Sequence, residues 1–417
     1  MQAALISQDR TRSEAAALFT QAGIRLKYLY RSRLFLRPLL SPRLSGYEPL
    51  QGAPEVDAAT MLQFKAIWLT AGLMRKNQRR AKRMKESGLK AHLDRWHAGL
   101  CEELLQACQG QSRPPVQTVP TFDWRRRSPE DFFTSYVKRP HPVVLKGFFE
   151  DPQRLGLWTL EAMARRYGDE EVLLTSTRKD GYPGKFKEVL KDGVYLHNSE
   201  YLLKKFPELL GSLQLQRLEP FIHKKVGFAQ LFAGRKGTGT AFHSALPWNF
   251  FFMLEGKKRW HLVHPQHSFL LYPVATPLGA HASFALCRSL ESADTKAYPL
   301  FKYCPILEVT LEPGDVLLNP PWWWHAVENI TEATVGVASR WHSEGQVGAS
   351  SFRMTEEDYE ISRFHSLNFQ LGPKGVPFLH AILKDPSPHI DEHHTVRETQ
   401  NRFIHTQRLM SMTKAPY

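Results

Sequence analysis

Residues 240–249 read TAFHSALPWN, and further along the chain residues 311–325 read LEPGDVLLNPPWWWH. Both stretches lie among short runs typical of β-strands. Strand alternation places His243 and Ala245 on one face of a strand and Ser244 on the other, whereas His325 belongs to a distant strand. A closed β-barrel can bring two distant strands opposite each other. The two stretches therefore predict one histidine-containing site inside a barrel.

The region around these stretches is built from short apolar runs separated by Gly and Pro, a pattern that favours a sandwich or barrel. The predicted strands are Pro142 to Phe148, Val226 to Ala233, Trp248 to Leu254, Arg259 to Val263, Ile306 to Leu311, Val316 to Asn319 and Thr334 to Trp341. We expect a mainly β fold with flanking helices.

The remainder of the chain has a different texture. Between about Ala58 and Cys108 apolar residues recur at three- and four-residue steps, which is helical spacing. Gln109 to Pro120 is rich in Gly, Ser, Gln and Pro and reads as a linker. We therefore divide the chain into a basic, mainly helical region (1–110), a linker (111–120), the barrel (121–345) and a short helical or loop-like tail (346–417).

The net charge of +14 is concentrated at the N-terminal side, with 22 Lys and Arg against 10 Asp and Glu up to Ser128. The densest cluster, between Arg75 and Lys85, could bind nucleic acid or another anionic surface, or be a solvated helix face. Residues 1–45 have the Arg-rich composition of an organelle-targeting segment, although Asp9 and Glu14 count against that interpretation.

The cysteine pattern and the lack of membrane-spanning or secretory segments in the sequence indicate the cellular compartment. The four cysteines, Cys101, Cys108, Cys287 and Cys304, form no CxxC pair and are too scattered for a disulfide framework. The sequence has no apolar run long enough to span a membrane and no secretory signal pattern. We expect an intracellular protein, cytoplasmic or nuclear, with organelle targeting as the alternative.

Together the two quoted stretches, with Gly256 to Trp260 between them, resemble the JmjC, or cupin-like, family of Fe(II)- and 2-oxoglutarate-dependent oxygenases. The likeness is greatest to its small hydroxylase branch, typified by the asparaginyl hydroxylase that inhibits hypoxia-inducible factor. It covers roughly residues 121–341 and implies a double-stranded β-helix, or jelly-roll, core. The resemblance implies that His243 and His325 are iron ligands and that Lys258, Thr240 and Asn249 bind 2-oxoglutarate.

The chemistry asks for such groups independently of the resemblance. Ferrous iron that activates oxygen favours imidazole ligands with open positions beside them. A buried dianion needs a fixed cation and hydrogen-bond donors. Taken alone, His325 after three tryptophans reads as a packed core histidine, and Lys258 as a surface lysine in a turn. Their joint order and spacing favours the site.

The family pattern is broken at Ala245, where the metal-binding carboxylate is expected, because alanine cannot ligate a metal. Three interpretations follow. The chain is an oxygenase completed by water or a nearby carboxylate, with Glu255 and Asp315 as candidates. Or it is a halogenase, in which chloride or bromide occupies the open position and restores the missing negative charge. Or it is an inactive protein that keeps the fold for binding.

If the protein is active, the resemblance implies that 2-oxoglutarate is decarboxylated to succinate while a C–H bond of the substrate is hydroxylated or halogenated. We expect a protein or small-molecule substrate, because small relatives act mostly on protein side chains.

Overall fold

The structure is a computed structural model that describes residues 50, 52–57, 59–61, 63–64, 66–67, 86–149, 152–176, 182–245, 248–274, 282–287, 289–291, 293–321 and 323–342. The predicted targeting segment, the cluster from Arg75 to Lys85 and the predicted tail lie outside these residues.

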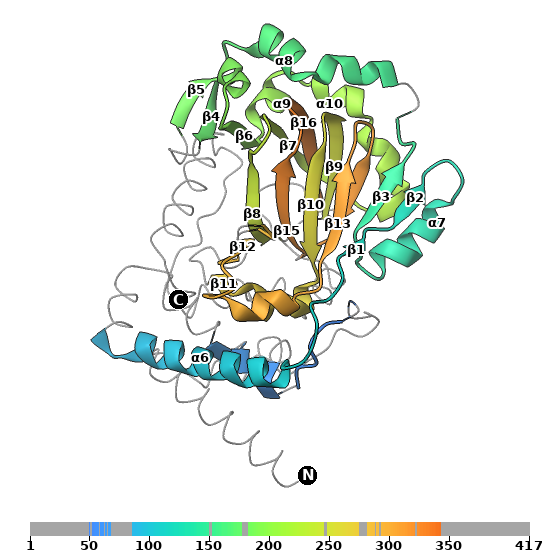
Figure 1. The fold of residues 1–417 in the computed structure, drawn as a ribbon. Coiled ribbons are helices and arrows are strands. Elements are labelled where there is room, and N and C mark those ends of the chain that lie inside the picture. Colours follow the sequence, from blue (N-terminus) through green and yellow to red (C-terminus); the bar gives the residue numbers. More distant parts are fainter. Residues whose placement is uncertain are drawn as a thin grey trace, which may run out of the picture.

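Two large mixed sheets form the centre of the described part (Figure 1). The smaller has the order β1-β13-β10-β15-β8-β12-β11 and the larger the order β2-β3-β14-β9-β16-β7-β6-β4-β5. The smaller sheet contains β1 (Gln117–Thr118), β8 (Gly239–Ala245), β10 (Lys258–Val263), β11 (Pro273–Val274), β12 (Ala282–Ala285), β13 (Leu307–Leu311) and β15 (Trp324–Asn329). The larger contains β2 (Thr121–Asp123), β3 (Val143–Lys146), β4 (Glu171–Ser176), β5 (Tyr182–Lys185), β6 (Val194–Ser199), β7 (Lys225–Gly234), β9 (Trp248–Glu255), β14 (Val316–Asn319) and β16 (Thr334–His342).

The central strands are buried on both faces, and strand alternation sorts their side chains into separate cores. On β9, Phe251 and Met253 face the space between the sheets, while Phe250 and Phe252 face the helices outside. On β10, Trp260 and Leu262 share the inner core with Phe251, and Val263 belongs to the other side. This alternation identifies the inward-facing positions of each strand, and those positions line the site described below.

Helices cover the two ends and one side of the barrel (Figure 1). They are α6 (Leu89–Ala107), α7 (Pro129–Phe132), α8 (Leu160–Tyr167), α9 (Tyr201–Lys205), α10 (Glu208–Leu213), α11 (Glu219–Ile222), the 3-10 helices Pro152–Trp158, Phe186–Leu190, Leu215–Leu218, Pro265–Leu271 and Pro299–Tyr303, and the π-helix Phe133–Val137. Leu93 and Leu100 of α6 pack in one apolar cluster with Phe269 and Phe301, so α6 lies against the lower end of the barrel in Figure 1.

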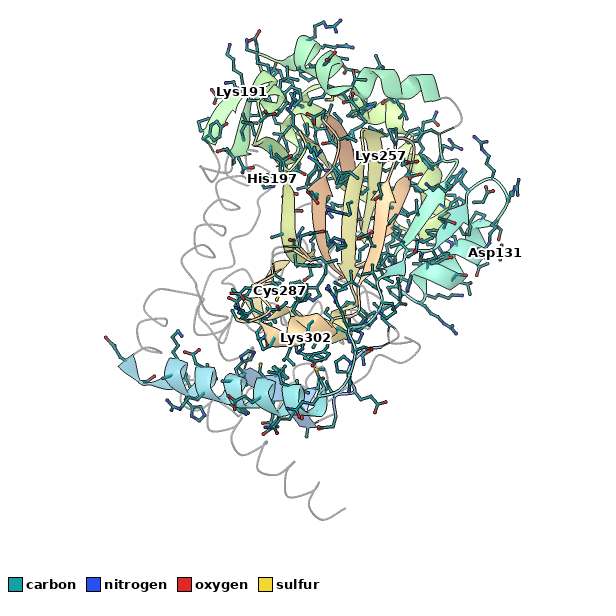
Figure 2. The ribbon with its side chains drawn as sticks, in the orientation of Figure 1. Asp131, Lys191, His197, Lys257, Cys287 and Lys302 are labelled. Carbon is teal, nitrogen blue, oxygen red and sulfur yellow. The ribbon has the colours of Figure 1, made fainter. Side chains whose placement is uncertain are left out.

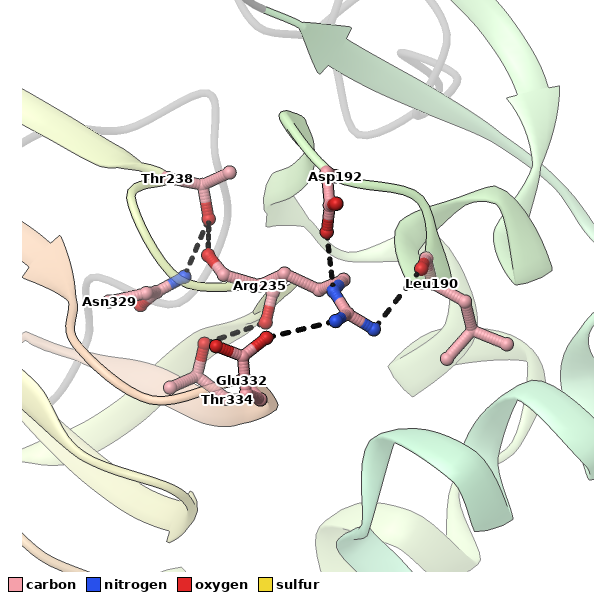
Figure 3. Close-up of polar contacts among 8 residues, drawn as sticks. Leu190, Asp192, Arg235, Thr238, Asn329, Glu332 and Thr334 are labelled. Atoms are coloured by element: carbon pink, nitrogen blue, oxygen red, sulfur yellow. Dashed lines mark hydrogen bonds and ion pairs between the residues drawn. The ribbon is translucent and has the colours of Figure 1, made fainter.

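The turn between β7 and β8 sets where the site strand begins (Figure 3). Arg235 forms ion pairs with Asp192 (2.8 Å) and Glu332 (2.9 Å), which tie the turn to two neighbouring loops. Asn329 of β15 donates a hydrogen bond to Thr238 (2.8 Å). At Gly239 an added Cβ would lie 2.0 Å from the carbonyl oxygen of Val327, so only glycine lets β8 approach β15 this closely.

The predicted mainly β, double-stranded β-helix fold with flanking helices is confirmed, and each of the seven predicted strands overlaps an observed strand. Strand β1 lies inside the predicted linker and pairs in parallel with β13. Among the described residues, no helix is long and apolar enough to span a membrane.

Candidate functional site

Two histidines from neighbouring strands form the centre of the site. His243 of β8 and His325 of β15 are Cα partners, and their ring centroids lie 4.1 Å apart. Nδ1 of His243 lies 2.9 Å from the carbonyl oxygen of Ala241, and Nδ1 of His325 lies 2.9 Å from that of Trp323. A carbonyl accepts a hydrogen bond from a protonated Nδ1, so in this tautomer Nε2 carries the lone pair of each ring. Both rings can therefore present Nε2 to a metal.

Burial keeps both imidazoles neutral. It lowers the pKa of His243 to about 4, the Ala241 carbonyl opposes this, and the charge of Arg340 lowers it further. Burial and the neighbouring His243 hold the pKa of His325 well below its ordinary value. Neutral imidazole is the form that binds a metal ion.

A register shift in the pairing of β8 with β15 brings Thr240 onto the same face as His243. His325 pairs with His243, but Val327 pairs with Thr240, so β8 has one extra residue between the two pairs. Side chains three residues apart normally point to opposite faces of a strand, but the extra residue of the bulge turns Thr240 and His243 to the same face. Thr240 therefore faces the barrel interior beside the histidine pair.

Lys258 is a buried cation within the barrel. Its side chain is 1% exposed, and Nζ lies 5.3 to 5.8 Å from the ring centroids of Tyr195, Phe232 and Phe251. Nζ also donates a hydrogen bond to the Tyr195 hydroxyl at 3.3 Å. Burial lowers its pKa to about 7. The adjacent Lys257 instead pairs with Glu312 at the surface (Figure 2), so the interpretation of Lys258 as a surface lysine is wrong.

Strand β6 connects the lysine to the histidines. The ring of Tyr195 stacks on that of His197, with centroids 5.5 Å apart. Burial lowers the pKa of His197 to about 4, and the charges of His243 and Lys258 lower it further. His243 and Lys258 therefore both lie near enough to His197 to act on it, and the three side chains belong to one site.

The larger sheet presents a row of polar groups from three adjacent strands. Asn249 of β9 is the Cα partner of Asn319 of β14 and of Arg340 of β16. All three are buried, and each has a buried polar atom without a hydrogen-bond partner in the described part of the chain: Oδ1 of both asparagines and Nη1 of Arg340. Buried polar groups are normally paired, so this row is suited to a polar ligand.

Ala245 lies on β8, two residues beyond His243, and is half-buried. Neither predicted substitute for its missing carboxylate reaches the site. Glu255 lies at the far end of β9, where its Oε2 accepts a hydrogen bond from the Leu160 backbone (2.6 Å). Asp315 forms an ion pair with Lys146 (2.7 Å). Within the described residues no group of three or more His, Cys, Asp or Glu is placed to hold a metal.

These side chains could therefore bind two kinds of ligand, a carboxylate and a metal ion, to different degrees. Lys258, the Tyr195 hydroxyl and the unpaired Nη1 of Arg340 are hydrogen-bond donors that fit a buried carboxylate ligand. His243 and His325 fit a metal with two protein ligands, and the remaining positions would need ligands from solvent or a cosubstrate.

Sequence reasoning predicted Thr240, His243, Asn249, Lys258 and His325, and the structure brings all five to the barrel interior. It did not identify Tyr195, His197, Asn319 and Arg340. The sequence did contain one indication of Arg340: it is the only Lys, Arg, Asp or Glu in the mostly apolar strand β16, which implies a buried charge.

Comparison with known proteins agrees with this architecture. Residues 176–346 match the family model of the cupin-like domain. The human HSPB1-associated protein 1 is 36% identical over 110 residues, which are 26% of this chain and 22% of that protein. JmjC domain-containing protein D of Dictyostelium discoideum is 34% identical over 101 residues, 24% of this chain and 22% of that protein.

A bifunctional arginine demethylase and lysyl-hydroxylase of Caenorhabditis briggsae is 25% identical over 244 residues, which are 52% of this chain and 60% of that protein. The matches to the first two relatives span about a fifth of the length of those proteins. The barrel is therefore similar in sequence to the cupin-like domain and to JmjC domain-containing proteins.

Proposed function

We propose that this chain is a JmjC-type oxygenase that uses Fe(II) and 2-oxoglutarate. The observation that carries the proposal is the juxtaposition of the His243–His325 pair with the buried cation of Lys258. A two-imidazole metal site and a carboxylate-binding lysine in one barrel are the groups that this chemistry requires. When bound, iron and 2-oxoglutarate would supply the oxidant for a C–H bond of a protein or small-molecule substrate.

The residues of the chain have separate roles in this proposal. His243 and His325 hold the metal through Nε2, and their Nδ1 contacts to backbone carbonyls orient the rings. Lys258 and the Tyr195 hydroxyl bind the far carboxylate of 2-oxoglutarate. Thr240 and Asn249 orient its remaining polar atoms. The apolar walls formed by Phe232 and Phe251 exclude water and strengthen these contacts.

The third protein ligand is missing at Ala245, and this leaves the hydroxylase and halogenase interpretations open. Water at that position gives a hydroxylase. Chloride or bromide there gives a halogenase, and the halide would restore the negative charge that a carboxylate normally supplies. The expected difference is measurable, because only a halogenase depends on halide for product formation.

A specific observation also favours a second candidate, a binding protein that has lost catalysis. Arg340 places a cation near both histidines, and its charge lowers the pKa of each. A neighbouring cation opposes the binding of a metal ion for the same reason. The barrel would then bind a carboxylate ligand without turning it over.

An anaerobic titration with Fe(II) and 2-oxoglutarate separates these candidates. An oxygenase should develop a metal-to-ligand charge-transfer band and release succinate in air. His325→Gln should abolish the band, and His92→Gln on the exposed face of α6 is the matched control. Addition of chloride should alter the band only in a halogenase. Absence of the band with wild-type protein contradicts both enzyme candidates.

A further inference from the structure

Arg340 is a buried cation that has no carboxylate partner among the residues that the structure describes. It is 8% exposed and lies on β16, two residues beyond Ala338 of the inner core, so it faces the barrel interior. Its Nε donates a hydrogen bond to Oε1 of Gln230 (3.2 Å), and its Nη1 is buried with no acceptor in the described part. Burial lowers the pKa of Arg340 and the charge of Glu200 raises it, but the Glu200 carboxylate forms its ion pair with Lys204, at 2.7 Å.

The interior of the barrel therefore carries an excess of positive charge. Lys258 and Arg340 both face it, and Ala245 provides no carboxylate. The one buried carboxylate among the described residues, Asp315, is paired with Lys146 away from the site. A buried ion without a counter-ion costs several kcal/mol, so such an arrangement is stable mainly when a ligand supplies the opposite charge.

The geometry of the unpaired groups indicates the chemistry of that ligand. A guanidinium presents parallel N–H donors that match a carboxylate better than a spherical ion. Asn249 is the Cα partner of Arg340, and its amide can turn its NH₂ toward an anion. Lys258 stands at a separate place in the same interior, joined to the histidines through Tyr195 and His197. Two separate cations suit an anion with two charged ends.

We propose that Arg340 is a second carboxylate-binding residue, so that the barrel holds a dicarboxylate such as 2-oxoglutarate at both ends, by Lys258 and Arg340, without needing a metal. This inference rests on the proposed binding of 2-oxoglutarate at Lys258. In this arrangement the fixed positive charge of Arg340 supplies part of the attraction for the dicarboxylate that iron would otherwise supply.

Isothermal titration of the metal-free full chain, in the presence of a chelator, tests the proposal. The probes are glutarate and pentanoate, which have the same chain length and differ in the second carboxylate. Wild-type protein should bind glutarate at least about tenfold more tightly than pentanoate, because charge-assisted hydrogen bonds to carboxylate contribute more than 1 kcal/mol. Arg340→Gln should remove this preference, as should Lys258→Met.

Arg126→Gln, which makes the same change at an exposed arginine, should retain the preference. Thermal unfolding without ligand checks that Arg340→Gln still folds. A glutarate preference unchanged in Arg340→Gln, or no glutarate binding by the metal-free wild-type protein, overturns the proposal. Iron-dependent succinate release is measured separately: turnover without metal-free binding contradicts only this inference, whereas metal-free binding without turnover contradicts only the oxygenase proposal.

Discussion

The imidazole rings of His243 and His325 face each other across β8 and β15 at a centroid distance of 4.1 Å, with their Cα atoms in register. Two rings this close, buried and acted on by Arg340, resist protonation. The pair is therefore neutral at pH 7, and the charge placed around it decides whether it binds a cation. Two positions set that charge: Ala245 provides no carboxylate, and Arg340 provides a buried cation.

Substitution Ala245→Asp should raise the affinity for Fe(II) by at least about tenfold, because loss or gain of groups that support a metal typically changes affinity by that order. The new carboxylate would lie on the same face as His243 and offset the charge of Arg340. Competition with a chromogenic chelator under anaerobic conditions measures the change.

Ala245→Asn is the matched control for size, because it adds a side chain of the same shape without charge. An increase of equal size in both variants would show that the effect is not due to the carboxylate. Unchanged affinity in Ala245→Asp would mean that another group already completes the centre.

Binding of glutarate should be accompanied by proton uptake at pH 8. Burial lowers the pKa of Lys258 to about 7, so the lysine of the empty site is mostly neutral at that pH. A bound carboxylate favours the charged form and raises the pKa again, and uptake should approach about one proton. Affinity should fall as the pH rises above 7. Titrations in buffers of different ionisation enthalpy measure the uptake, and equal heats in all buffers would contradict the prediction.

Sequence reasoning was most successful where a residue type, a spacing and a strand period agreed. The runs at Trp248 to Leu254 and Val316 to Asn319 were recognisable because each is apolar except for one asparagine, which is close to the pattern of strands buried on both faces. The family resemblance implied that Thr240 and Asn249 bind the cosubstrate; this role stays a prediction, and the strand pairings place both residues on inward faces. The pairing of His243 with His325 also agrees with the expectation of a closed barrel.

What could not be predicted depends on contacts between distant strands. The bulge that places Thr240 and His243 on one face is set by pairing with β15, and no local pattern encodes it. The sequence alone could not exclude Glu255 and Asp315 as metal ligands, because their distance from the histidines depends on the fold. The role of Arg340 became visible only when its neighbours in the barrel were known.

The free energy of unfolding should fall when the pH drops from 6.5 towards 4, in part because of His267. Burial lowers the pKa of this residue to about 4, so the unfolded chain binds a proton in that range and the folded chain does not. The stability is present above pH 6.5 and is lost as the pH falls. His267→Gln should reduce the loss between pH 7 and pH 5 by about 2 kcal/mol, measured by urea unfolding.

The exposed His92 provides the control for this measurement, since His92→Gln should leave the pH dependence of the wild-type protein unchanged. Only the difference between the two pH values matters, because any change of packing in His267→Gln affects both. An undiminished loss in that variant would show that other groups cause the acid sensitivity.

Substitutions at two turn glycines with positive φ can distinguish the cost of backbone strain from the cost of a steric clash. Gly256 (φ 73°) precedes β10 and its Lys258, and an added Cβ would lie 1.9 Å from the carbonyl oxygen of Ala333. Gly314 (φ 96°) precedes β14, and nothing lies within 4 Å of its added Cβ. Gly314→Ala should therefore cost about 1–2 kcal/mol, the price of the left-handed conformation alone. Gly256→Ala should cost more and also weaken glutarate binding, because relieving the conflict shifts the start of β10. Chemical unfolding and titration measure both effects, and equal costs in the two variants would mean that the Ala333 carbonyl moves aside freely.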